Sequence, residues 1–322
     1  MSNGKKIAII IACVMTGVGI LILLAAVIGI NFDFTRLNTV KTERVSYTIE
    51  EDFDSIEINC ADSDVRFVKS TDGKCRVECI QEENIIHTAE VMNGVLTISQ
   101  GDERNTRDHF IIIFDFAETG VTVYLPEEEY ESLYVKTLSG DIAISEGFSF
   151  SDAEVSTESG DVMCLAKANG KLTIESKSGD AELMNSSAEE ILVKSLSGDV
   201  MIYSANADSK LTAEALSGDV EVRDANADNL SASSTSGDIE LLRVSAVEFN
   251  AVTTSGDIEF SRCDADDIRM KSTSGDITGS LLSEKMFSVH TTSGHVNVPD
   301  DGGSGKCEIS TTSGNVNMRI DK

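Results

Sequence analysis

Residues 133–144 read LYVKTLSGDIAI, and the Ser-Gly corner within this segment returns along most of the chain. Each return comes 19 or 20 residues after the one before it. The Ser-Gly pairs begin at Ser139, Ser159, Ser178, Ser197, Ser217, Ser236, Ser255, Ser274, Ser293 and Ser313. A fixed period of about 20 residues is typical of stacked repeats, in which each unit contacts only its neighbours.

Apolar residues alternate with polar ones on both sides of the corner. Before the serine they stand at minus six and minus four, as Leu133 and Val135 do, and a small residue such as Thr137 stands at minus two. After the serine they stand at plus three and plus five, as Ile142 and Ile144 do. A period of two on both sides of a glycine-containing corner indicates a strand, a bend and a second strand.

Equivalent residues recur in the same chain direction, so successive coils should lie parallel on one another. We therefore predict an all-β fold for residues 131–322, a single-stranded parallel β-helix (a solenoid) with about 19–20 residues per coil. We expect it to be right-handed, because parallel crossovers almost always are. Ala213, Ala232 and Ala251 share the minus-four position beside larger Leu and Phe residues, as the constant volume of a close-packed core requires.

Residues 45–130 continue the strand pattern in a degenerate form. Ile56–Phe67 fits the repeat frame, as a first coil without its glycine. The further strand candidates are Cys75–Cys79, Leu96–Ile98, Phe110–Phe116 and Val121–Leu125, and the polar run Gly101–His109 is expected to be a loop. We expect this region to cap the first open edge of the solenoid, because solenoids need an atypical end.

Residues 7–30 are uncharged and largely apolar, which is long enough for one helix to cross a bilayer. No small-residue cleavage site follows, so we favour an uncleaved transmembrane helix over a signal peptide. Lys5 and Lys6 precede the segment, and the positive-inside rule then makes residues 1–6 a cytoplasmic tail. We expect a single-pass protein of the cell membrane, with a juxtamembrane linker at residues 31–44 and the solenoid outside the cytoplasm.

The C-terminal coil is followed by no residues that could form a cap, since the sequence stops at Lys322. Either the terminal charges prevent this edge from pairing with another strand, or the edge binds a strand of a partner. Self-association through the C-terminal coil is one form of that docking.

The residue after each Ser-Gly pair is Asp in the first eight copies, then His295 and Asn315. We name the eight the aspartate column: Asp141, Asp161, Asp180, Asp199, Asp219, Asp238, Asp257 and Asp276. Carboxylates stacked about 4.8 Å apart repel by roughly 1 kcal/mol per neighbouring pair even in water. Something must therefore offset this repulsion.

Two interpretations offer that offset. Each Asp accepts backbone N–H bonds at its own corner, as Asp does in turns. Alternatively, the column from Asp161 to Asp276 holds a file of Ca²⁺ ions between its carboxylates. We favour the first, because Ca²⁺ takes six to eight oxygens and one carboxylate per coil supplies too few.

Three further features have structural explanations. Asp208, Asp228 and Asp266 repeat along a second edge, which we interpret as a solvated face. Gly302–Lys306 lacks the first glycine of a P-loop and indicates a turn. Ser293 has no strand-to-helix elbow around it, so nothing supports a nucleophile there.

His290 and His295 flank one corner, where we expect Asp276 below and Asn315 above. Such a group could bind a metal or exchange protons, but two surface histidines are ordinary, and we expect no metal site here. The thiols are expected to be free and buried, because none lies in a CxxC motif and Cys164 and Cys307 fall in distant coils.

The charge balance excludes one class of partner. With 26 Lys and Arg against 55 Asp and Glu, the net charge is −29, which repels nucleic-acid phosphates. The acids follow the repeat and do not cluster, and outward aromatic residues are sparse, so a polysaccharide lyase or hydrolase is disfavoured. We therefore predict that the protein is not an enzyme and needs no cofactor.

Residues 121–144, VTVYLPEEEYESLYVKTLSGDIAI, precede serial Ser-Gly-Asp coils and follow an N-terminal anchor. This arrangement resembles a bacterial β-strand-repeat family of unknown function named “putative adhesin”, over roughly Ile56 to the C-terminus. The resemblance implies a β-solenoid in a membrane-anchored envelope protein, and no catalytic residues. His295 and Asn315 depart from the pattern, which counts against any role that needs an unbroken Asp column.

The sequence thus predicts a non-catalytic, membrane-anchored β-solenoid that binds a cell-wall polymer or protein, or acts as a spacer in the envelope. One alternative is an envelope-stress regulatory or scaffolding protein that contacts another membrane protein. Another is a solenoid that polymerises end to end.

Overall fold

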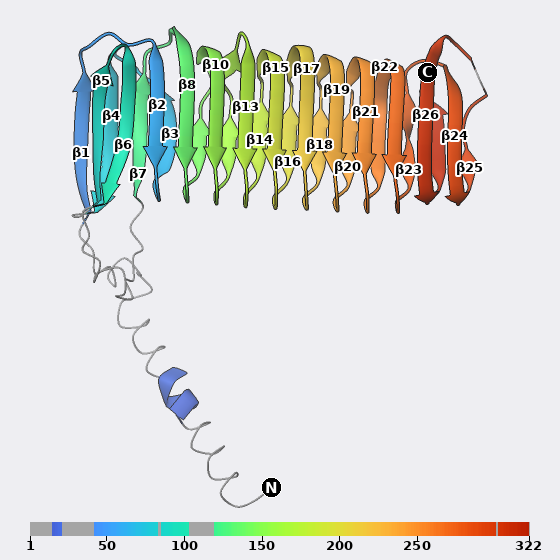
Figure 1. The fold of residues 1–322 in the computed structure, drawn as a ribbon, viewed down its shortest axis with the longest axis horizontal. Coiled ribbons are helices and arrows are strands. Elements are labelled where there is room, and N and C mark those ends of the chain that lie inside the picture. The colour runs from blue at the N-terminus through green and yellow to red at the C-terminus, as the bar shows by residue number, and fades with distance from the viewer. Residues whose placement is uncertain (1–14, 21–41, 83–84, 103–118, 301, 322) are drawn as a thin grey trace, which may run out of the picture.

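The computed structural model describes residues 15–20, 42–82, 85–102, 119–300 and 302–321. Within these ranges, the residues between Thr42 and Ile320 form an all-β solenoid built of two facing sheets (Figure 1). We name the sheet whose strands run into the Ser-Gly-Asp corners the entry sheet, and the sheet whose strands leave them the exit sheet. The predicted all-β solenoid is confirmed.

Each regular coil places one strand in each sheet, and every strand pairs in parallel with its equivalents in the neighbouring coils. The entry sheet contains β8 (Glu129–Thr137), β10 (Ser149–Thr157), β12 (Lys167–Ala168), β13 (Lys171–Ser176), β15 (Ser187–Ser195), β17 (Asn206–Ala215), β19 (Asn226–Ser234), β21 (Ser245–Thr253) and the second half of β22 (Ile258–Ser272). The exit sheet contains β9 (Ile142–Ile144), β11 (Val162–Cys164), β14 (Ala181–Met184), β16 (Val200–Tyr203), β18 (Val220–Arg223), β20 (Ile239–Leu242), the first half of β22 and β23 (Ile277–Leu281).

The core lies between the two sheets, as columns of side chains that share a repeat position. Val135, Val155 and Ile174 are register partners in three successive coils, and each is fully buried. Ala213 and Ala232 form a second such pair, and they too are fully buried. The inward positions predicted from the period of two are therefore the core.

A second bend, after each exit strand, returns the chain to the entry sheet. Its first residue has a positive φ between 50° and 56° in five successive coils, at Asn185, Ser204, Asp224, Arg243 and Arg262. Asn and Asp adopt the left-handed region more readily than Ser and Arg do. The bend survives with other residues because its backbone is held by the next coil, as the 2.9 Å bond from the Ser204 N–H to the Arg223 carbonyl shows.

The N-terminal cap combines one regular coil with antiparallel strands. The coil is formed by β2 (Ser55–Cys60) and β3 (Asp64–Lys69), which pair directly with β8 and β9. The remaining strands are β1 (Thr42–Ile49), β4 (Cys75–Glu82), β5 (Ile85–Met92), β6 (Val95–Asp102) and β7 (Gly120–Leu125). The pairs β1–β4, β4–β7 and β5–β6 are antiparallel, whereas β6 and β7 lie parallel on β2 and β3.

One predicted boundary in this region needs correction. The linker was expected to reach residue 44, but β1 already begins at Thr42, because its backbone pairs with β4 from Glu82 onward. The region was expected to form degenerate coils and an N-terminal cap. In the structure β2 with β3 and β6 with β7 form parallel layers, and β1, β4 and β5 add antiparallel strands to them. The strand candidate Phe110–Phe116 and most of the loop Gly101–His109 lie outside the described residues.

The other end of the solenoid does not follow the order of the sequence. The last two coils are formed by β24 (Lys285–Ser293) with β25 (Val296–Asn297), and by β26 (Gly305–Ser313) with β27 (Val316–Ile320). β26 and β27 pair directly with β22 and β23, and β24 and β25 lie outside them (Figure 1). The C-terminal coil is therefore an inner layer, and the prediction that it forms the open edge is wrong.

Among the residues that the structure describes, no helix combines the length and apolar character that a membrane crossing requires. Residues 15–20 are helical, and the rest of the predicted span at residues 7–30 lies outside the described ranges.

Candidate functional site

The carboxylates of the aspartate column bond from coil to coil. Oδ1 of Asp180 accepts a hydrogen bond from the backbone N–H of Asp199 at 2.8 Å, and Oδ1 of Asp199 accepts one from the N–H of Asp219 at 2.8 Å. The series begins one coil earlier than the column, because Oδ1 of Asp64 accepts the N–H of Asp141 at 3.0 Å. The column therefore caps backbone donors, but the prediction that each Asp caps its own corner is wrong.

These bonds explain how the acids tolerate their stacking. A hydrogen bond to a charged group contributes about 1.5–3 kcal/mol. Repulsion between neighbouring carboxylates in water costs about 1 kcal/mol at the coil spacing. The bond therefore exceeds the repulsion at each step, and the column can exist without a cation between its members.

The glycine and the small hydroxylic residue of each corner complete the stack. A Cβ atom added to Gly218 would lie 2.0 Å from the carbonyl oxygen of Gly198, so only glycine allows this approach. The hydroxyl of Ser234 donates to the carbonyl oxygen of Gly218 at 2.8 Å, and equivalent bonds recur along the stack. Ala215 stands at this position in one coil and supplies no hydroxyl. Each corner is thus bonded to its neighbour through a side-chain acceptor and, in most coils, a side-chain donor.

The end of the column explains the order of the last coils. The N–H of Asn315 donates to Oδ1 of Asp276 at 2.7 Å, and Oδ1 of Asn315 accepts the N–H of His295 at 3.0 Å. An inner coil must offer an acceptor to one more corner, and the amide oxygen of Asn315 takes the place that Oδ1 of Asp holds in the other coils. His295 therefore lies outermost, and the expected order, with Asn315 above His295, is wrong.

The histidine group is not gathered into a site. His290 and His295 lie exposed on the outermost coil, as does Ser293. Asn315 separates His295 from Asp276 along the column. Within the described residues, no group of three or more His, Cys, Asp or Glu side chains is arranged to hold a metal ion.

A shallow groove runs beside the column on the exit sheet. Its volume is about 300 Å³. Its acidic lining consists of Asp199, Asp219, Asp238, Asp257, Glu221, Glu240 and Glu259. Arg223 forms ion pairs with Glu221 and, at 3.3 Å, with Glu240. We name this groove the acidic groove; its chemistry suits positively charged groups that repeat at the coil spacing.

The second edge is solvated, as predicted. Asp208, Asp228 and Asp266 are all exposed. Nearby acids that the sequence pattern did not distinguish form ion pairs instead. Asp224 accepts two hydrogen bonds from Arg243, at 2.5 and 2.6 Å, and they hold the pKa of its carboxyl below the ordinary value.

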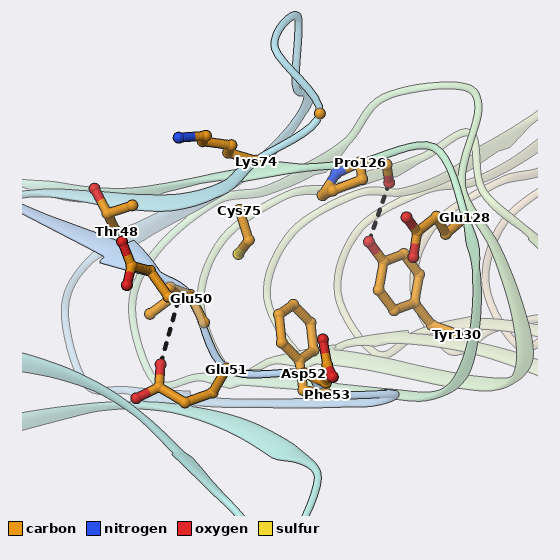
Figure 2. Close-up of a pocket in the computed structure, with 12 residues that line it drawn as sticks. Thr48, Glu50, Glu51, Asp52, Phe53, Lys74, Cys75, Pro126, Glu128 and Tyr130 are labelled. Carbon is orange, nitrogen blue, oxygen red and sulfur yellow. Dashed lines mark hydrogen bonds between the residues drawn. The ribbon is translucent and has the colours of Figure 1, made fainter.

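A hollow of about 370 Å³ lies in the cap, between the end of β1, the β3–β4 turn and the start of β8. The rings of Phe53 and Tyr130 stack at 5.9 Å along one wall, beside Cys75. Figure 2 shows the carboxylate of Asp52 beside the Phe53 ring and that of Glu128 beside the Tyr130 ring. The hydroxyl of Tyr130 donates to the carbonyl oxygen of Pro126 at 3.0 Å. Burial raises the pKa of Tyr130. Aromatic rings beside carboxylates suit a small cation better than an anion.

A polar cluster that sequence reasoning missed lies inside the cap. Ser63 stands at the frame position of the corner glycine, and its hydroxyl lies 2.9 Å from Nε2 of His87 on β5. The side-chain oxygen Oε1 of Gln81, on β4, accepts a hydrogen bond from the backbone N–H of His87 at 2.8 Å. Ser63 and His87 are fully buried, so the pair is a structural cluster that a substrate does not reach. Gln81 and His87 lie on β4 and β5, and Ser63 lies in the turn between β2 and β3, so their spacing along the chain carries no motif.

The cap should lose stability in mild acid because of His87. Burial lowers the pKa of His87, and the nearby carboxylate of Asp62 only partly opposes this shift. The unfolded chain therefore binds the proton at a higher pH than the folded chain does, so stability is full above the ordinary value of 6.5 and falls as the pH drops below it. We expect the melting temperature to fall more steeply between pH 7 and pH 5 for the natural chain than for His87→Gln. Equal slopes for the two chains would contradict this assignment.

The cysteines of the described residues are free and buried, as the spacing predicts: Cys60, Cys75, Cys79, Cys164, Cys263 and Cys307. Burial raises the pKa of the Cys75 and Cys79 thiols to about 12, so both remain protonated and unreactive. They act as small apolar core residues.

Comparisons with solved structures find matches of low sequence identity. A “putative adhesin” from Parabacteroides merdae is 15% identical, with a TM-score of 0.42, and covers 88% of this chain and 98% of its own. A “putative adhesin” from Parabacteroides distasonis is 15% identical, with a TM-score of 0.44, over 87% of this chain and 98% of its own. A “putative lipid binding protein” from Parabacteroides distasonis is 16% identical, with a TM-score of 0.38, over 88% and 98%.

A comparison with curated proteins finds no match. The family model described as Toastrack DUF4097 matches twice, at residues 53–210 and 205–322. These two matches cover the cap from Phe53 onward and the whole stack of corners. The chain belongs to the Toastrack DUF4097 family.

Proposed function

We propose that the protein is a non-catalytic binding or spacing module of the cell envelope. In this proposal the apolar segment at residues 7–30 anchors the chain in the cytoplasmic membrane, and the solenoid lies outside the cytoplasm. The chain binds a positively charged surface polymer or protein along the acidic groove.

One observation carries the proposal. The corner bonds run without interruption from Asp64 to His295, and the corner carboxylates from Asp64 to Asp276 are thereby held at a fixed spacing. Because the carboxylates are already held in place, binding a repeating cationic partner costs them little conformational entropy. Its weak single contacts add up when several are made together.

Location is tested by treating intact cells that express the full chain with an external protease. We expect the solenoid to be digested, because the proposal places it outside. A cytoplasmic marker protein must stay intact in the same cells, and permeabilised cells show that the protease can cut. Protection of the solenoid in intact cells, with digestion after permeabilisation, would overturn the proposed location.

Binding is tested by cosedimentation of the full chain in detergent with isolated cell-wall material. The double variant Glu240→Gln and Glu259→Gln removes two charges from the acidic groove. The control Asp208→Asn and Asp228→Asn removes two charges from the second edge. We expect the groove variant to bind at least about threefold more weakly, and the control to bind as the natural chain does. Equal losses, or no sedimentation of the natural chain, would overturn binding along the groove.

A further inference from the structure

The outer strand of the entry sheet, β24, pairs with β26 on one side and with no described strand on the other. Along β24 the backbone N–H and C=O groups of successive residues point alternately toward β26 and away from it. The carbonyls of Lys285 and Ser293 accept bonds from the N–H groups of Gly302 and Gly314, on the side of β26. Residues two apart in a strand point the same way, so the backbone of Ser288 points outward. The outer side of β24 therefore offers a row of backbone donors and acceptors.

The core is only partly covered at this end. Phe287 and Val289 are half-buried, whereas their register partners in the next coil, Cys307 and Ile309, are 0% and 2% exposed. At the opposite end the antiparallel strands of the cap cover the core, and Cys79 there is fully buried. The core is therefore covered at the N-terminal end of the solenoid and only partly covered at the β24 end.

Charge distinguishes this end from the rest of the chain. Residues 285–299 contain no Asp or Glu, and no longer run without them occurs after residue 32 in a chain of net charge −29. The charge of Lys285 is buried in an ion pair with Asp264 at 2.7 Å. His295 also replaces the carboxylate of the corner at this coil. If a second copy contacts residues 285–299, those residues place no carboxylate in the contact. Contacts between most other surfaces of two such acidic chains would be repulsive.

We propose that two copies of the chain join through their β24 strands. A two-fold axis makes the paired edges antiparallel, so the entry sheets form one continuous sheet and the partly covered core of each copy is closed by the other. The axis also limits this assembly to a dimer, because the β24 edges of both copies are used in the one interface. This arrangement differs from end-to-end polymerisation, which would need the N-terminal cap to accept β24.

The dimer is tested by light scattering of the full chain in detergent, across a concentration series. Ser288→Pro removes an outward N–H without breaking a bond to β26, and Ser288→Ala keeps that N–H. We expect the natural chain and Ser288→Ala to be dimers, and Ser288→Pro to dissociate at least tenfold more readily with an unchanged melting temperature. A natural chain that stays monomeric at about 100 μM would overturn the proposal, as would a Ser288→Pro chain that dimerises equally well.

A second measurement covers the outcome in which Ser288→Pro fails to fold. Ser288→Cys places a thiol on β24, at the proposed interface between the two copies. Asp208→Cys places one on the exposed second edge, away from β24. Under mild oxidation we expect a disulfide-linked dimer from Ser288→Cys and no more than background from Asp208→Cys. Equal crosslinking of the two variants would overturn the proposal.

Discussion

Replacement of Gly218 by Ala is expected to destabilise the solenoid by about 3 kcal/mol, at the upper end of the range for overpacked sites. The new Cβ would lie 2.0 Å from the carbonyl oxygen and 2.4 Å from the carbonyl carbon of Gly198. Both atoms are backbone and are held by the stack, so neither can rotate away as a side chain would. The midpoint of urea unfolding measures the loss.

Gly101→Ala is the matched control. Gly101 also lies in a strand, β6, but the nearest atom to its added Cβ is a carbonyl oxygen at 3.8 Å, an ordinary contact. Ala is a better strand residue than Gly, so we expect this variant to be unchanged or slightly more stable. Similar losses at the two positions would contradict the view that close stacking is what demands glycine at the corner.

Replacement of Asp219 is expected to show what the carboxylate does. Oδ1 of Asp219 accepts the N–H of Asp238 at 2.8 Å. Ala removes this acceptor, whereas Asn keeps an oxygen in its place and removes the charge. We expect the Ala variant to be less stable than the Asn variant by about 1–3 kcal/mol, the cost of leaving a donor without its partner.

The Asn variant itself should be at least as stable as the natural chain in low salt. Asn removes the repulsion from the carboxylates of both neighbours, about 1 kcal/mol each in water. Added salt screens this repulsion, so the advantage of Asn should shrink as the ionic strength rises. Asn315 is a natural example, because its side chain accepts one corner N–H and donates toward the carboxylate of Asp276.

The same pair of variants tests the Ca²⁺ interpretation of the column. A file of Ca²⁺ ions predicts that Ca²⁺ raises the melting temperature of the natural chain and that a chelator reverses the rise. It also predicts that Asn at position 219 weakens the response, because it removes a charged ligand. Equal stability of the Ala and Asn variants without Ca²⁺ would contradict the hydrogen-bonding role of the column.

The cap and the outer coils could be predicted only in part. Asp62-Ser63-Asp64 fits the repeat frame, and the structure places it as the first corner of the stack. Ser63 can replace glycine there because its side chain lies against His87 of the cap and not against another corner. His87 and Gln81 lie on different strands and Ser63 lies in the turn between β2 and β3, so no local sequence pattern predicts their contact. The same holds for the ion pair between Lys285 and Asp264.

The repeat in the sequence determined the regular part of the protein. The alternation around each Ser-Gly pair is local, since each coil buries the same positions, and it was enough to predict parallel coils, the buried columns and the outward acids. The tertiary structure alone decided which coil lies next to which. At both ends the chain turns back, so that β6 and β7 lie outside β2 and β3, and β26 and β27 lie inside β24 and β25. Any one coil could stack on almost any other, because the repeats present similar edges. Their order therefore depends on contacts between residues distant in the chain, such as those of Asn315 with Asp276 and His295.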